Sequence, residues 1–145
     1  MDDEVATPAL LRAARRTYGS AIRHAQRAAG FDDVPRNGSF VLGAIARTGS
    51  PLSEVVAALG VSKQAAGQLV DTLVVRGYLS RTPDPEDRRR LTVTLTERGR
   101  EVAAVTRAAV EQVDAQLAER VGVEEVGRAR GVMWALIEIG AREEA

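Results

Sequence analysis

Apolar residues recur every three or four positions in most segments of this chain, but in one short segment they alternate with polar residues. Leu91, Val93 and Leu95 are two positions apart, with Thr92 and Thr94 between them, as in a strand buried on one face. The spacing in the other apolar segments is typical of amphipathic helices. We therefore predict a mainly α fold with a small β-hairpin.

The order of these segments predicts helix, helix, helix, helix, hairpin, helix, helix. Thr7 before Pro8, and Ser53, Ser62 and Thr96 further on, are suitable N-caps for the first, third, fourth and fifth helices. Gly30, Gly60, Gly77 and Gly122 follow apolar stripes and are expected to end helices. The expected helices cover residues 7–30, 39–47, 54–59, 63–76, 97–122 and 124–140, and the expected strands cover residues 78–82 and 91–95.

Composition narrows the classes of function. The chain has 145 residues, 45% of them apolar, which is enough for one soluble domain with a real core. It has no cysteine and one histidine, so cysteine catalysis, zinc thiolate sites and multi-histidine metal sites are excluded. We expect no enzyme, no cofactor and no metal. No segment is apolar enough to span a membrane, and residues 1–4 are too acidic for a signal peptide, so we expect a cytoplasmic protein.

The formal net charge is zero, but the charge is unevenly distributed. Residues 36–100 hold ten Lys and Arg against six Asp and Glu, a net charge of +4, while residues 101–145 hold five against nine, a net charge of −4. A basic centre in a neutral chain is expected if only that part faces a polyanion, although ordinary variation of surface charge could also produce it.

Two short helices joined by a turn at Gly60 predict a helix-turn-helix, and the hairpin that follows makes it a winged one. In the second helix, the polar residues face outward because Ala66, Leu69, Val70 and Leu73 face the core. The loop between the strands holds three consecutive arginines, which suit contact with phosphates or the minor groove. A helix pair with a glycine turn also occurs in proteins that do not bind DNA, and the hairpin favours DNA binding.

At these residues the sequence resembles the MarR family of winged helix-turn-helix transcriptional regulators. The resemblance rests on residues 52–62, on residues 73–81, and on the acid-x-arginine pattern of Asp87 and Arg89 followed by Leu-Thr-Glu-Arg-Gly at residues 95–99. It implies a single domain over residues 1–145, with a DNA-binding lobe at residues 36–100 and dimerisation helices at residues 7–30 and 101–145.

The resemblance also implies roles for individual residues. Arg89 would enter the minor groove with Asp87 bracing it, Arg88 and Arg90 would contact phosphates or be spectators, and Arg81 would contact the DNA backbone. The alternative for Asp87 and Arg89 is a surface ion pair that contributes at most ~1 kcal/mol. The recognition-helix candidates are Ser62, Lys63, Gln64, Gln68 and Thr72.

The recognition helix departs from the family pattern at Ala65, Ala66 and Gly67, where relatives usually have hydroxyl side chains. A glycine inside an exposed helix costs about 1 kcal/mol relative to alanine. Either Gly67 permits close approach to DNA or to a neighbouring helix, or the helix is simply less stable here. The residues that read bases therefore stay open between Gln64, Gln68 and others.

The terminal helices resemble the dimerisation region of the family, and their apolar stripes need a second copy for burial. The expected interface residues are Val113, Leu117, Met133, Leu136 and Ile137. By the same resemblance, Tyr18, His24 and Phe40, with Trp134, would line a pocket for a phenolic or other aromatic effector. The competing interpretation makes Tyr18 and Phe40 core residues and His24 a surface or packed residue.

Together these features predict a homodimeric, sequence-specific regulator that binds a palindromic operator in double-stranded DNA, a repressor that an effector releases. The alternative is an architectural winged-helix protein with little sequence preference. A third interpretation is a protein-interaction module that has lost DNA binding.

Overall fold

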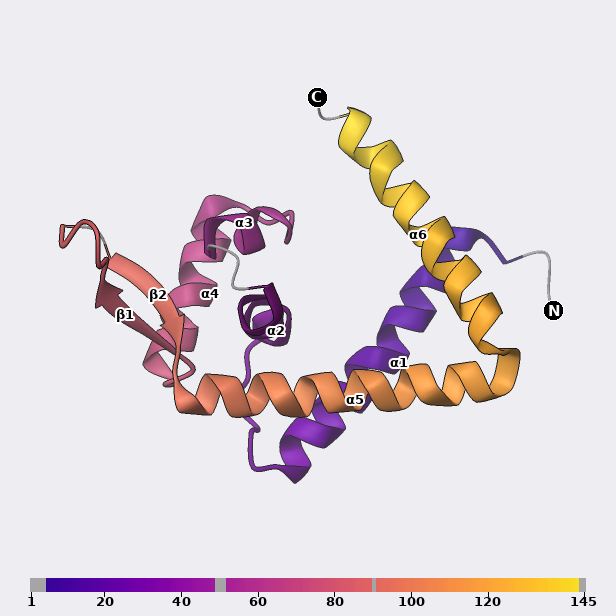
Figure 1. Ribbon diagram of the computed structural model, residues 1–145, viewed down its shortest axis with the longest axis horizontal. Helices are drawn as coiled ribbons and strands as arrows, with labels where there is room; N and C mark the ends of the chain where they lie inside the picture. The colour runs from indigo at the N-terminus through magenta and orange to yellow at the C-terminus, as the bar shows by residue number, and fades with distance from the viewer. Residues whose placement is uncertain (1–4, 49–51, 90, 144–145) are drawn as a thin grey trace. The chain divides into compact units, whose positions relative to one another are not determined.

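The computed structural model describes residues 5–48, 52–89 and 91–143, and the element order is the one expected from the sequence (Figure 1). The prediction of a mainly α fold with one antiparallel hairpin is confirmed. The elements are α1 (Thr7–Ala28), α2 (Gly38–Thr48), α3 (Leu52–Ala57), α4 (Lys63–Val75), β1 (Leu79–Pro83), β2 (Leu91–Leu95), α5 (Glu97–Val121) and α6 (Val123–Glu143).

Two of the four expected N-caps are confirmed. The hydroxyl of Ser62 accepts a hydrogen bond from the amide of Ala65 at 3.1 Å, and that of Thr96 accepts one from Gly99 at 3.0 Å. The expected cap at Thr7 is wrong, because Ala6 is the N-cap and Thr7 is already the first helical residue. Helix α1 therefore begins without a side-chain cap. The expected cap at Ser53 is also wrong, because α3 begins at Leu52 and already includes Ser53.

The end of α4 sets the start of the hairpin. Gly77 has a φ of 76°, a left-handed conformation that favours glycine, and it directs the chain out of the helix. The amide of Tyr78 then donates to the carbonyl of Leu73 at 2.9 Å. Because Tyr78 completes this helix end, β1 begins at Leu79, one residue later than expected, and it pairs with β2 from Leu79 opposite Leu95 to Pro83 opposite Leu91.

By contact clustering the chain divides into two compact units, residues 1–109 and residues 110–145. The core of the first unit is formed by α2, α3, α4, the hairpin and the start of α5. Its fully buried large side chains are Val41, Leu42, Leu73, Tyr78, Leu79 and Val102. Gln26 of α1 is also buried, and its amide donates to the hydroxyls of Ser39 at 2.7 Å and Thr106 at 3.0 Å, so one side chain joins α1, α2 and α5.

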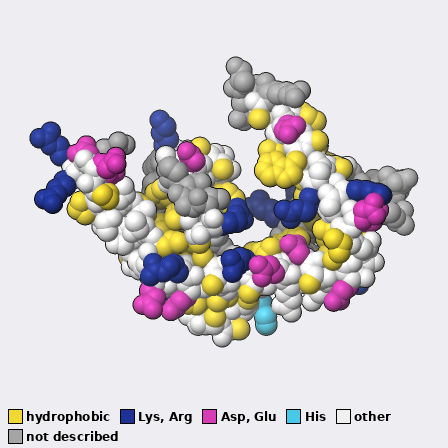
Figure 2. Space-filling view, viewed as in Figure 1, with side chains coloured by type: hydrophobic (Ala, Val, Ile, Leu, Met, Phe, Trp, Pro, Cys, Tyr) yellow, Lys and Arg dark blue, Asp and Glu magenta, His cyan; other side chains and the backbone are white. Residues whose placement is uncertain are grey.

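The second unit contains the end of α5 and the helix α6, and it leaves apolar side chains in solvent. Figure 2 shows hydrophobic side chains exposed along α6. The exposed large apolar residues of α6 include Val132, Met133, Trp134, Leu136, Ile137 and Ile139. None of the described helices is both long and apolar enough to span a membrane.

Candidate nucleic-acid interface

The outer face of α4 is polar because its inner face packs into the core. Ala66, Val70 and Leu73 are buried, and they follow one another at offsets of four and three. The same geometry leaves Lys63, Gln64 and Gln68 fully on the solvent side, where all three are exposed. The predicted recognition helix therefore presents one cation and two amides that can donate and accept hydrogen bonds.

The two hydroxyl candidates of α4 already have local partners. Ser62 caps the helix through the amide of Ala65, and the half-buried Thr72 donates its hydroxyl to the carbonyl of Gln68 at 2.8 Å. Each hydroxyl oxygen can still accept a further hydrogen bond, but each already makes one local hydrogen bond, whereas the side-chain amides of Gln64 and Gln68 make none within the described residues. Direct readout of bases by α4 would thus fall mainly to the two glutamines.

Gly67 lies on the exposed side of α4, and a Cβ built there would meet no described atom within 4 Å. The alternative that Gly67 allows a neighbouring helix of the same chain to approach is therefore wrong for the described residues. The remaining interpretations are close approach to an external partner and a weaker helix. Ala65 beside it is also exposed, so these two positions offer no side-chain hydrogen-bonding group to a partner.

The tip of the hairpin is shaped by its acidic residues. The carboxylate of Asp84 accepts hydrogen bonds from the amides of Glu86 at 2.8 Å and Asp87 at 3.4 Å, and that of Asp87 accepts one from the amide of Arg89 at 3.0 Å. Such short side-chain-to-backbone bonds stabilise turns. Asp87 thus holds the backbone of Arg89, and within the described residues the two side chains form no ion pair.

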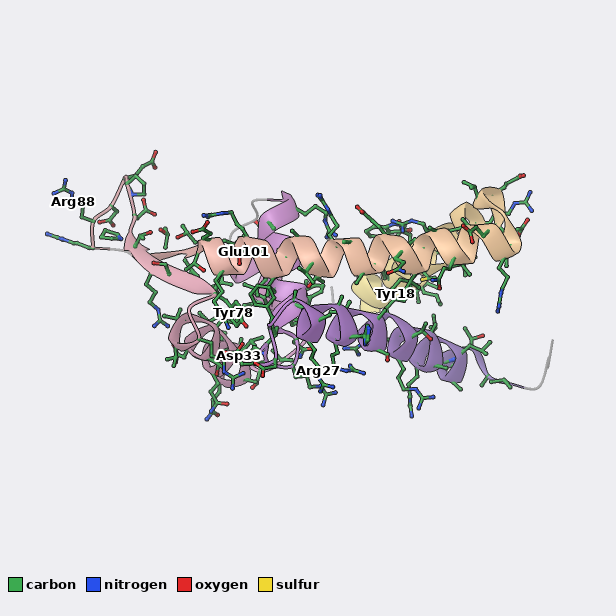
Figure 3. The ribbon with its side chains drawn as sticks, turned by 90° about the horizontal axis from the view of Figure 1, so that it is seen from below. Tyr18, Arg27, Asp33, Tyr78, Arg88 and Glu101 are labelled. Carbon is green, nitrogen blue, oxygen red and sulfur yellow. The ribbon has the colours of Figure 1, made fainter. Side chains whose placement is uncertain are left out.

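These turns leave the tip arginines projecting into solvent. Arg88 and Arg89 are exposed, and neither guanidinium has a hydrogen bond or an ion pair within the described residues. Figure 2 shows Lys and Arg side chains extending from the hairpin tip, and Figure 3 shows Arg88 at its outer end. The predicted contact at Arg90 lies outside the described residues. The tip therefore presents two unpaired guanidinium groups beyond a turn that its acidic residues hold together.

Arg81 of β1 forms an ion pair with Asp71 of α4, and both side chains are largely exposed. An exposed pair of this kind contributes about 0–1 kcal/mol, so a phosphate could replace the carboxylate at small cost. The sequence does not indicate a role for Asp71, because no local spacing links a helix residue to a strand residue ten positions later.

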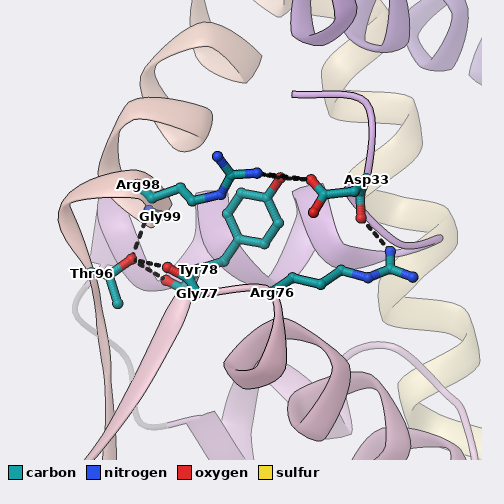
Figure 4. A network of polar contacts seen from close by, with 7 residues as sticks. All are labelled: Asp33, Arg76, Gly77, Tyr78, Thr96, Arg98 and Gly99. Carbon is teal, nitrogen blue, oxygen red and sulfur yellow. Dashed lines mark hydrogen bonds and ion pairs between the residues drawn. The ribbon is translucent and has the colours of Figure 1, made fainter. Parts of the chain in front are cut away.

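A second set of polar contacts holds the hairpin and α4 to the rest of the first unit (Figure 4). Asp33, in the segment between α1 and α2, accepts hydrogen bonds from the hydroxyl of Tyr78 and, at 3.0 Å, from the guanidinium of Arg98. Arg98 also lies over the rings of Tyr78 and Phe31, 4.7 Å and 5.3 Å from their centroids. The carbonyl of Asp33 accepts a further hydrogen bond from Arg76, at the end of α4.

The contacts of this cluster change the acidity of two of its members. The hydrogen bond from Tyr78, and then the charge of Arg98, lower the pKa of Asp33 below 3.8, against the opposing effect of burial. Burial, followed by the hydrogen bond and the negative charge of Asp33, raises the pKa of Tyr78 to about 12. At neutral pH the cluster therefore contains an ionised Asp33, a neutral Tyr78 and a charged Arg98. In the sequence, Asp33 lies between the first two expected helices, and no spacing there indicates that Tyr78 and Arg98 are its partners.

The three effector-pocket candidates have different environments. Tyr18 is half-buried and His24 is exposed, both on α1, while Phe40 of α2 is 47% exposed. The core interpretation is therefore wrong for Phe40, because the inner face of α2 is taken by Val41 and Leu42. The pocket itself stays a prediction.

Residues 32–90 match the sequence model of the MarR family. A transcriptional regulator from Thermotoga maritima has a similar structure, with 26% identity, a TM-score of 0.56 and 94% of both chains covered. The transcriptional repressor CouR, solved bound to a 23-mer DNA duplex, has 27% identity and a TM-score of 0.66 over 93% of both chains. MarR has 23% identity and a TM-score of 0.74, over 99% of this chain and 97% of its own. No curated protein sequence matches the chain.

Proposed function

We propose that this chain, which has the fold of the MarR-family transcriptional regulators and matches that family over residues 32–90, is a homodimeric DNA-binding regulator of transcription. The observation that supports this most directly is the pairing of an exposed polar face on α4 with a hairpin tip, where the guanidinium groups of Arg88 and Arg89 have no partner among the described residues. A polar helix face of this kind suits the major groove, and an arginine on a thin tip suits the adjacent minor groove.

We assign a role in DNA binding to each exposed residue from the hydrogen-bonding groups or charge that its side chain presents to solvent. Gln68 and Gln64 each present an amide that can pair with an adenine edge, while Lys63 in the first turn of α4 would contact a phosphate. Arg89 would enter the minor groove, and its backbone bond to Asp87 would fix the direction in which it leaves the turn. Arg88 and Arg81 would contact phosphates, with Arg81 exchanging Asp71 for the DNA backbone.

Dimerisation is supported by the apolar surface of the second unit. Met133, Leu136 and Ile137 are 47%, 43% and 58% exposed, and Leu117 of α5 is 38% exposed. A second copy would remove this surface from water, at about 25 cal/mol for each Å² buried. Two copies related by a two-fold axis would then read an inverted repeat with half-site centres about 10 base pairs apart.

Repression and effector release form the finer part of the proposal. CouR is a repressor solved on DNA, and this chain shares 27% identity with it over nearly its whole length. Tyr18 and Phe40 would supply the aromatic surface for a phenolic effector. Dissociation of the DNA complex by a panel of phenolic compounds, reduced in Phe40→Ala, tests this part separately.

The central test is a salt titration of DNA affinity with the wild type, Arg89→Ala and the control Arg120→Ala, which removes an exposed arginine from α5. Loss of one phosphate contact lowers the slope of log affinity against log salt by about 0.9. We expect this change for Arg89→Ala and an unchanged slope for Arg120→Ala. Equal slopes for all three proteins would remove the hairpin from the interface.

The architectural alternative is favoured by the sparse functional groups at Ala65 and Gly67. Footprinting on the DNA that flanks the gene distinguishes it from a specific regulator. A protected palindrome of about 15–25 base pairs supports the regulator, and uniform coating of the fragment supports the architectural protein.

A further inference from the structure

Helix α1 presents a row of arginines that the proposed function does not use. Its 22 residues contain five arginines and no acidic residue, and the acids of that third of the sequence precede or follow the helix. Four of the arginines, Arg12, Arg16, Arg23 and Arg27, are separated by four, seven and four positions. Since those offsets return to the same side of an α-helix, the four side chains share one face.

This arginine face, defined as Arg12, Arg16, Arg23 and Arg27, is open to solvent. All four residues are exposed, and none forms an ion pair or hydrogen bond with its side chain within the described part of the chain. Arg27 points away from α1 on the side opposite to Tyr18, which belongs to the apolar side of the helix (Figure 3). The packed side of α1 is thus used for the fold, and the arginine face is free.

Gly19 precedes Arg23 by four positions, so it lies on the same side of the helix as the arginine face. A Cβ at Gly19 would lie 3.2 Å from the guanidinium of Arg23, so the absence of a side chain at this position gives that guanidinium room beside the helix backbone. Like charges at i and i+4 destabilise a helix, and α1 holds two such pairs, Arg12 with Arg16 and Arg23 with Arg27. A bound anion would relieve this repulsion.

We propose that the arginine face of α1 is a second contact surface for the DNA backbone, separate from α4 and the hairpin. Arg12 and Arg27 are about 22 Å apart along the helix axis, the length over which one DNA strand places about six phosphates. A protein partner is less well matched, because protein interfaces combine arginine with aromatic and other apolar anchors, whereas this face is made of four arginines with Gly19 on the same side. Contacts of this kind add affinity without sequence preference.

This inference rests on the proposed DNA binding, and its test uses the full-length protein with a random-sequence 40-base-pair duplex. The face variant is Arg16→Gln with Arg23→Gln, and the control is Arg120→Gln with Arg130→Gln, which removes the same charge from exposed positions of α5 and α6. Glutamine and arginine have similar helix propensities, so α1 is expected to stay helical by circular dichroism.

The face variant is expected to lower the slope of log affinity against log salt by up to about 1.8, and the control to leave it unchanged. The charge-preserving variant Arg16→Lys with Arg23→Lys should keep the wild-type slope. An unchanged slope in the face variant, alongside a reduced slope in Arg89→Ala, would overturn the inference and leave the proposed function standing. A wild type that binds no duplex at any salt concentration would overturn both.

Two further results would also overturn it. If the face variant is a monomer by light scattering where the wild type is a dimer, the arginines act through assembly. If the variant keeps the wild-type slope on DNA but no longer binds polyglutamate, the surface serves an acidic protein.

Discussion

Gly99→Ala is expected to destabilise the protein severely, although glycine is usually the weaker residue within a helix. Gly99 is the third residue of α5, and it is buried against the start of the hairpin. A Cβ at this position would approach the carbonyl oxygen of Tyr78 to well under 3.0 Å and the side chain of Leu95 to 3.1 Å. The first of these contacts is with backbone, which cannot move aside as a flexible side chain can.

The magnitude follows from what that carbonyl does. It accepts a hydrogen bond from the amide of Thr96 at 3.1 Å, and at 3.1 Å it also shares the single hydroxyl proton of Thr96 with the carbonyl of Gly77, which is nearer at 2.6 Å. Moving it away costs roughly 1–2 kcal/mol for the amide bond and the shared hydroxyl bond and about 1–3 kcal/mol for overpacking, so the free energy of unfolding should fall by about 2–5 kcal/mol. For a chain of this size, Tm should fall by roughly 2–4 °C for each kcal/mol.

The assay is urea and thermal unfolding followed by circular dichroism at one fixed protein concentration. Gly67→Ala is the matched control, because it also replaces a helical glycine by alanine but meets open space. That variant should be stabilised by up to about 1 kcal/mol. A Gly99→Ala protein as stable as the wild type would refute the close contact between α5 and Tyr78.

Other predictions concern charge, readout and assembly. The folded-state pKa of Asp33 lies below 3.8, so the ionised carboxylate contributes stability above pH 3.8, and this contribution is lost as the pH falls through the folded pKa. The difference in free energy of unfolding between the wild type and Asp33→Asn should therefore shrink below pH 3.8. A difference that stays constant from about pH 7 downward would contradict this. Gln68→Ala should reduce discrimination between cognate and random DNA by about 1–3 kcal/mol in competition assays, while Lys63→Ala should weaken both equally; unchanged discrimination in Gln68→Ala would exclude that side chain from readout. Leu136→Glu should be a monomer by light scattering and lose specific binding, and a dimer that binds normally would contradict the proposed interface.

The sequence by itself determined the order of the elements and the direction of their faces. Helical and strand periodicities are local, since they depend on which side of one helix or strand a residue occupies. They were enough to place Val70 and Leu73 in the core, Gln68 on the outer face of α4, and the arginine tip between two paired strands. The caps at Ser62 and Thr96 are also local, and both are confirmed.

Only the tertiary structure decided which polar groups meet. Asp33 and Arg98 are 65 positions apart, and no periodicity relates a residue in an interhelical segment to one in a distant helix. The ion pair between Arg81 and Asp71 likewise depends on how the hairpin packs beside α4. A charged side chain has many possible partners in a sequence, and its partner is selected by the packing of the apolar core, which brings a few of them within hydrogen-bonding distance.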